Sequence, residues 1–223
     1  MKRFYFLLFF MVALISCQSP EKKAEKLIKA YMFKSLYDYK SYEATETKID
    51  SCYNSIFYDT EAQLAALAAK ESIEEAQEYK EDLEDAEFDM NLWYDSRYMT
   101  NYGKSRYKSA KEDYNEARKK LLEAQISSNE NLLQIKQKSI DYNTDFIGWE
   151  VKHSFRCNTR GGDPSLGNYT FIINKDFTEI INVIDKDDES TMEATIIIAT
   201  AMSLTVEDLE SNIQEATEML NKL

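Results

Sequence analysis

The stretch IGWEVKHSFRC, residues 147–157, alternates apolar and polar side chains without a break. Successive side chains of a strand point to opposite faces of its sheet, so this pattern predicts a strand with one buried face. Two β-rich runs follow at 168–173 and 177–184 and are predicted to form a β-hairpin. The glycine-rich run at 158–168 is expected to be a loop. The sequence thus predicts a three-stranded antiparallel meander, and residues 42–47 are a candidate fourth strand.

A long segment of helical composition precedes the meander. Between Asp59 and Tyr142 there is no proline and one glycine, Gly103, whereas Ala, Glu, Lys, Leu and Gln dominate. Apolar residues recur every three or four positions on both sides of Gly103, which is the spacing of a coiled-coil seam. We predict an antiparallel helical hairpin over residues 59–143 with its turn within 99–104. Its seams are rich in alanine, which buries little area, so support from a third helix, the body or a partner is expected.

The two ends of the mature chain add helices to the predicted sheet. Ser19, Pro20 and Glu21 are typical of a helix start, and the amphipathic pattern that they begin ends near Asp38. A last amphipathic helix follows Thr205, while the apolar residues 194–204 fit either a buried strand or a helix.

The expected fold class is therefore α+β. We expect a small antiparallel sheet with N- and C-terminal helices, interrupted by the long helical hairpin. Residues 21–58 and 144–223 are expected to form one body around the insertion at 59–143.

The first residues are typical of an export signal. Lys2 and Arg3 precede an apolar run at 4–15, which is too short to span a bilayer but fits the core of a secretory signal peptide. The next four-residue pattern, Leu14-Ile15-Ser16-Cys17, resembles the lipobox of bacterial lipoproteins. An ordinary secretory peptide with an unrelated cysteine is the alternative.

The lipobox resemblance implies a lipid anchor. Residues 1–16 would be removed, and Cys17 would carry fatty acyl chains such as palmitate, with residues 17–20 as a short lipidated tether. Gln18, rather than Asp, follows the cysteine, which in lipoprotein families favours the outer membrane. The expected location is thus the bacterial cell envelope, with the membrane bound through the lipid.

The charge balance excludes several classes of partner. The 27 Lys and Arg residues face 40 Asp and Glu residues, giving a net charge of −13. Nucleic-acid binding depends on cations that neutralise phosphates, so no nucleic-acid partner is expected. The same balance argues against electrostatic docking of the whole chain onto an anionic lipid surface.

No catalytic constellation is evident in the sequence. His153 is the only histidine and lies on the apolar face of its predicted strand, so we expect a structural residue in the core rather than a catalytic base. Common zinc sites need several His or Cys ligands. We expect no enzymatic activity, no metal site and no cofactor other than the covalent lipid on Cys17.

Two features remain as candidate sites. Cys52 and Cys157 would be the non-lipid cysteines and are predicted either to pair as a disulfide at the base of the hairpin or to remain buried free thiols. Aromatic residues gather near the predicted turn and form either a small core that stabilises it or an exposed tip that binds a partner. The candidate tip residues are Trp93, Tyr94, Tyr98 and Tyr102.

Three segments, residues 34–43, 148–156 and 169–171, resemble a group of small, uncharacterised bacterial envelope lipoproteins. Tyr39 stands where that group usually has proline. The resemblance implies a compact α+β body with a helical insertion, and it carries no catalytic residues. We therefore expect a non-enzymatic binding or scaffolding lipoprotein with a protein partner. The alternative is an inhibitor or immunity-type protein that neutralises a basic envelope enzyme, as the acidic charge suggests.

Overall fold

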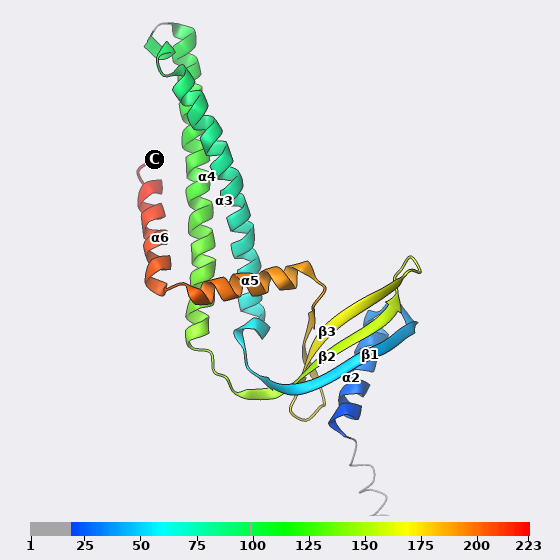
Figure 1. Ribbon diagram of the computed structural model, residues 1–223. Coiled ribbons are helices and arrows are strands. Elements are labelled where there is room, and N and C mark those ends of the chain that lie inside the picture. Colours follow the sequence, from blue (N-terminus) through cyan, green and yellow to red (C-terminus); the bar gives the residue numbers. More distant parts are fainter. Residues whose placement is uncertain (1–18, 99) are drawn as a thin grey trace, which may run out of the picture. The chain divides into compact units, whose positions relative to one another are not determined.

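The computed structural model describes residues 19–98 and 100–223, and it confirms the α+β class (Figure 1). The chain divides into two compact units. We call the unit formed by residues 19–54 and 143–189 the sheet unit. The other unit, the helical unit, is formed by residues 55–142 and 190–223.

The sheet unit contains one antiparallel sheet in the order β1-β2-β3-β4. The strands are β1 (Asp38–Tyr53), β2 (Phe146–Asn158), β3 (Pro164–Asn174) and β4 (Ile180–Asp185). The alternating stretch forms β2 as predicted, and the candidate fourth strand is real but extends over the whole of β1. The loop predicted over 158–168 is too long, because Pro164 already pairs with Asn158 of β2. Gly167 belongs to β3 and pairs with Phe155 of β2, whose ring occupies the space where a Cβ on residue 167 would lie.

Helix α2 (Pro20–Ser35) covers one face of this sheet (Figure 1). It begins where the sequence predicts, with Ser19 as N-cap and Pro20 in the first turn. It ends at Ser35 rather than near Asp38, because Asp38 already opens β1. Its buried residues join one cluster with the inward side chains of the strands: Ala24, Ile28, Met32, Val151, Phe155, Phe171 and Ile173.

The helical unit is built on the predicted hairpin. Helices α3 (Thr60–Trp93) and α4 (Asn101–Ile140) pack side by side (Figure 1), and η1 (Ile56–Tyr58) precedes α3. Along α3 the alanine-rich seam is buried near the base and half-buried towards the turn, whereas on α4 Ala110 is buried close to the turn. The Asp59 carboxylate caps α3 by accepting from the Ala62 N–H at 2.9 Å, and it also pairs with Lys138 of α4 at 2.8 Å. Asp59 thus stabilises a helix start and joins the two arms.

The turn of the hairpin lies earlier than predicted. The chain leaves α3 after Trp93, passes through η2 (Ser96–Tyr98) and enters α4 at Asn101, so most of the expected turn 99–104 is helix. Gly103 belongs to the first turn of α4, where its N–H donates to the Thr100 hydroxyl at 2.9 Å. A Cβ at Gly103 would lie 2.2 Å from the Ser96 carbonyl oxygen. The glycine therefore permits a close approach of α4 to η2 and does not itself make the turn.

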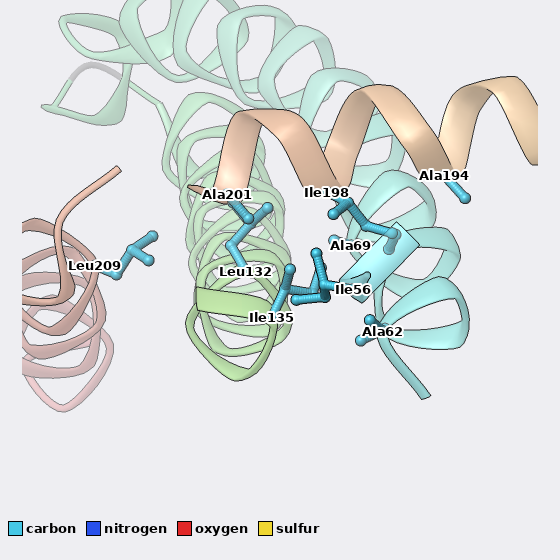
Figure 2. Packing of buried hydrophobic residues seen from close by; sticks show 11 residues of the cluster. Ile56, Ala62, Ala69, Leu132, Ile135, Ala194, Ile198, Ala201 and Leu209 are labelled. Carbon is cyan, nitrogen blue, oxygen red and sulfur yellow. The ribbon is translucent and has the colours of Figure 1, made fainter. Parts of the chain in front are cut away.

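The C-terminal residues belong to the helical unit, and their assignment to the body was wrong. Residues 194–204, for which strand and helix were both open, lie almost entirely in α5 (Glu189–Ser203), and α6 (Val206–Leu220) packs along α4. The reason is that the alanine side chains at the base of the hairpin bury little area by themselves, so larger side chains must pack against them. Figure 2 shows the resulting cluster, whose buried members are Ile56, Ala62, Ala65, Ala66, Ala69, Leu132, Ile135, Ala194, Ile198, Ala201 and Leu209. The third-helix support that the alanine seams require is thus present.

Candidate binding site at the hairpin tip

The hairpin tip, which we define as residues 92–111, is organised around Arg97. The Arg97 guanidinium lies 3.3 Å from the ring centroid of Tyr94 and 4.2 Å from that of Tyr98, and it donates to the Tyr98 hydroxyl at 2.7 Å. It also donates to the Tyr94 carbonyl oxygen. Two edge-to-face ring pairs, Trp93 with Tyr102 and Tyr94 with Tyr107, link the two arms. Cation–π and ring contacts therefore fix the geometry of the turn.

The four predicted tip residues come together, but they are not equally exposed. Tyr98 is 78% exposed and Tyr102 is 66% exposed, whereas Trp93 is half-buried. Trp93 thus belongs to a small core that stabilises the turn. Tyr94, Tyr98 and Tyr102 present their rings to solvent, so the tip combines the two arrangements that the sequence left open.

A cavity of about 780 Å³ opens beside these rings. It is lined by Arg97, Tyr98, Thr100, Asn101, Lys104, Tyr107, Lys108 and Lys111. Its three lysines are spaced by four and three residues, which places them on one face of α4. The cavity therefore combines four cationic side chains with two phenol rings and two short polar groups.

The positive charge of this cavity is largely unneutralised within the described part of the chain. Residues 96–111 contain five Lys and Arg and no Asp or Glu. Lys108 lies 3.7 Å from Glu112, while no ion pair with Arg97, Lys104 or Lys111 is found among the described residues. Clustered like charges raise the electrostatic potential of a concave site, which suits an anionic group on a ligand. These cations were not among the predicted site residues, although the run from 96 to 111, which has no carboxylate, marks them in the sequence.

The shaft below the tip has the opposite charge. Residues 71–89 of α3 carry ten Asp and Glu residues against a single lysine, Lys80. The tip is therefore a local cationic site on an acidic helix pair, and its charge is opposite in sign to the net charge of the chain.

Cys52 and Cys157 do not form the candidate disulfide. Both thiols are free, but only Cys52 is buried as the alternative expected, whereas Cys157 is half-buried. Cys52 of β1 stands opposite Gly148, whereas Cys157 lies nine residues further along β2, a separation of roughly 30 Å at the rise of a strand. A disulfide needs Cα atoms within about 7 Å. Burial raises the pKa of the Cys52 thiol to about 11, so this thiol stays protonated at neutral pH.

His153 is a structural residue, as its position on the apolar face predicted. It is 3% exposed, and both ring nitrogens are hydrogen-bonded: Nε2 to the Tyr42 hydroxyl and Nδ1 to the Thr47 hydroxyl, each at 2.8 Å. A hydroxyl can donate or accept, so these partners satisfy either neutral tautomer. Burial lowers the pKa of His153, and the nearby Glu25 carboxylate opposes this effect only in part.

Acidification is therefore expected to destabilise the sheet unit through His153. The folded-state pKa lies below the ordinary value of about 6.5, so the unfolded chain binds more protons as the pH falls through that value. The free energy of unfolding should decrease between about pH 7.5 and pH 5.5, measured by urea denaturation at each pH. A His153→Gln variant should be less stable but should lose most of this pH dependence. An equal slope in both proteins would assign the effect to other groups.

Other classes of site are not evident in the described residues. In residues 19–98 and 100–223, no group of three or more His, Cys, Asp and Glu side chains could hold a metal ion. Among the helices of these residues, none is long and apolar enough to cross a membrane. Cys17, the predicted lipidation site, lies outside the described residues with the predicted signal peptide, so its modification stays a prediction.

Comparison with known proteins does not identify the chain: no family model, curated protein or solved structure matches it. Its function must therefore be inferred from the chemistry of the tip and from the N-terminal motif.

Proposed function

We propose that this protein is a non-enzymatic binding or scaffolding lipoprotein of the bacterial cell envelope. Acyl chains on Cys17 hold it in the outer membrane, and the hairpin tip binds a protein partner. The observation that carries the binding role is the cationic cavity beside exposed tyrosines, in a chain whose net charge is −13. The lipobox-like residues 14–17 support the anchor.

The side chains of the tip are those that dominate the affinity of protein interfaces. Tyrosine and arginine are enriched among the residues whose truncation weakens complexes most. Arg97 is already stacked on Tyr94 and Tyr98, so the rings are held in place before a partner arrives. Such pre-organisation lowers the entropic cost of association. The partner surface that fits this tip is acidic, with an anionic group that enters the cavity.

The test is crosslinking mass spectrometry on intact cells. The tip variant Tyr98→Ser/Lys104→Gln/Lys111→Gln replaces three exposed side chains of the cavity. We expect at least a tenfold loss of the captured partner, because each interface anchor contributes on the order of 1 kcal/mol or more. The melting temperature should fall only slightly, because Arg97 loses its contact with Tyr98 but keeps Tyr94, and the two ring pairs that link the arms are not changed.

The matched control is Phe88→Ser/Lys80→Gln/Lys119→Gln on the shaft. It removes one exposed aromatic ring and two exposed lysines, so it changes the charge by the same amount as the tip variant. The control should capture the partner as the wild type does. Equal capture by all three proteins, or no specific capture by the wild type, would contradict the proposal.

The acidic shaft favours one alternative, an inhibitor or immunity-type protein that neutralises a basic envelope enzyme. The observation that favours this alternative is the set of ten carboxylates within residues 71–89 of α3. In that case the tip variant would keep its partner. Binding would instead collapse as salt rises, because exposed charges are screened over about 8–10 Å at physiological ionic strength.

A further inference from the structure

We propose that the exposed face of α2 is a membrane-docking surface that binds the headgroups of anionic phospholipids. The proposal does not rest on the hairpin tip or on its partner. We define the docking face as Lys22, Lys26, Lys29 and Phe33, which are all exposed. Their spacing of four, three and four residues aligns them along one side of the helix. The opposite side carries Ala24, Ile28 and Met32, which are buried against the sheet.

The charge of α2 is opposite to that of its surroundings. The helix contains five lysines and two glutamates, whereas the rest of the sheet unit has more carboxylates than cations. Glu25 pairs with Lys29 at 2.5 Å, and no ion pair with Lys22 or Lys26 is found among the described residues. An anionic bilayer would therefore attract this face and repel the remainder of the unit, which selects one orientation. The net charge of −13 for the whole chain does not reveal this local excess of lysines on α2.

Exposed aromatic side chains lie at the C-terminal end of the docking face, one within it and one just beyond α2. Phe33 is 68% exposed and Tyr37 is 74% exposed. The Arg160 guanidinium lies 5.7 Å from the Tyr37 ring centroid, which adds another cation to the same end. Lysine and arginine beside exposed aromatic rings fit the interfacial region of a bilayer, where rings sit at headgroup depth.

The position of α2 in the chain provides a second argument, which does not depend on the charge of the helix but rests on the proposed lipid anchor at Cys17. Only residues 17–19 link the predicted acylation site to the first residue of the helix, which is at most about 10 Å of extended chain. A membrane attached at Cys17 would thus lie within reach of Lys22 and Lys26. Stable anchoring commonly combines acyl chains with a basic patch, and α2 has the composition of that second signal.

Vesicle flotation of the unacylated chain isolates the docking face from the anchor. The protein is the chain from residue 17 onward with Cys17→Ser. The probes are phosphatidylcholine vesicles with and without an equal part of phosphatidylglycerol. The protein should float with the anionic vesicles at low ionic strength, should not float with the zwitterionic ones, and should dissociate at high salt. Lys22→Gln/Lys26→Gln/Lys29→Gln should weaken binding by roughly a hundredfold, as expected for three cations near a bilayer surface.

The matched control places the same charge change outside the sheet unit and outside the tip cavity. Lys80→Gln/Lys119→Gln/Lys222→Gln removes three exposed lysines, of which one is in an i,i+4 ion pair, as in the α2 variant. This control should bind vesicles as the parent protein does. Phe33→Ser should retain low-salt binding but should dissociate at a lower salt concentration than the parent protein does. Unchanged melting temperatures would show that the variants are folded.

Three results would overturn the docking face. They are a parent protein that does not float with anionic vesicles, equal flotation with both compositions, and equal losses in the α2 variant and its control. A larger loss in the control would place the lipid-binding site in the helical unit. None of these results depends on whether a protein partner is captured in cells.

Discussion

Replacing Phe171 by alanine is expected to lower the free energy of unfolding of the sheet unit by about 3–5 kcal/mol. The Phe171 side chain on β3 is completely buried. Its ring packs edge-on against Tyr31 of α2, with 5.4 Å between centroids, and also lies near His153. The truncation would leave a cavity between the helix and the sheet, because the rigid strands cannot close around it.

The measurement is urea denaturation, with tryptophan fluorescence as the signal that monitors unfolding. Each unit contains one tryptophan, Trp149 in the sheet unit and Trp93 in the helical unit, so a Trp93→Phe background makes the signal specific to the sheet unit. The control is Phe33→Ala on α2 of the same unit, the same change at a side chain that is 68% exposed. Its effect should stay within about 0.5 kcal/mol. Similar losses in the two variants would show that Phe171 does not anchor the core.

Replacing Cys17 by serine is expected to abolish fatty-acid labelling of the protein in cells and to remove it from the outer-membrane fraction. Each buried CH₂ of an acyl chain contributes roughly 0.8 kcal/mol to membrane attachment, so two or more chains hold a protein stably. Without them only the weaker, salt-sensitive contact of the α2 docking face would remain. Labelled palmitate and intact mass measure the acylation, and membrane fractionation measures the location.

The other two cysteines serve as matched controls. Cys52→Ser and Cys157→Ser remove thiols that lie within the sheet unit, so both variants should keep the label and the membrane location. A wild-type protein whose mature mass includes no acyl chains would eliminate the lipid anchor. Labelling that persists in Cys17→Ser would place the lipid elsewhere.

Local periodicity in the sequence determined the elements of this protein. The alternation at 147–157 specifies a strand with one buried face, and β2 buries Val151, His153 and Phe155 accordingly. The alanine seams specify two long helices, and Ser19 with Pro20 marks the start of α2. These predictions succeed because a period of 2 or 3.6 residues decides which side chains share a face, whatever that face later meets.

The tertiary structure alone decided which faces meet. Residues 194–204 have no clear period, and their helical state is fixed by Ile198 and Ala201 packing into the hairpin base. Strand register sets Cys52 and Cys157 far apart, although both are cysteines of one unit. The lysines of α4 and Arg97 form a cavity only because η2 folds back against Gly103. Such outcomes depend on long-range fit and close approach between segments, which short-range periodicity does not encode.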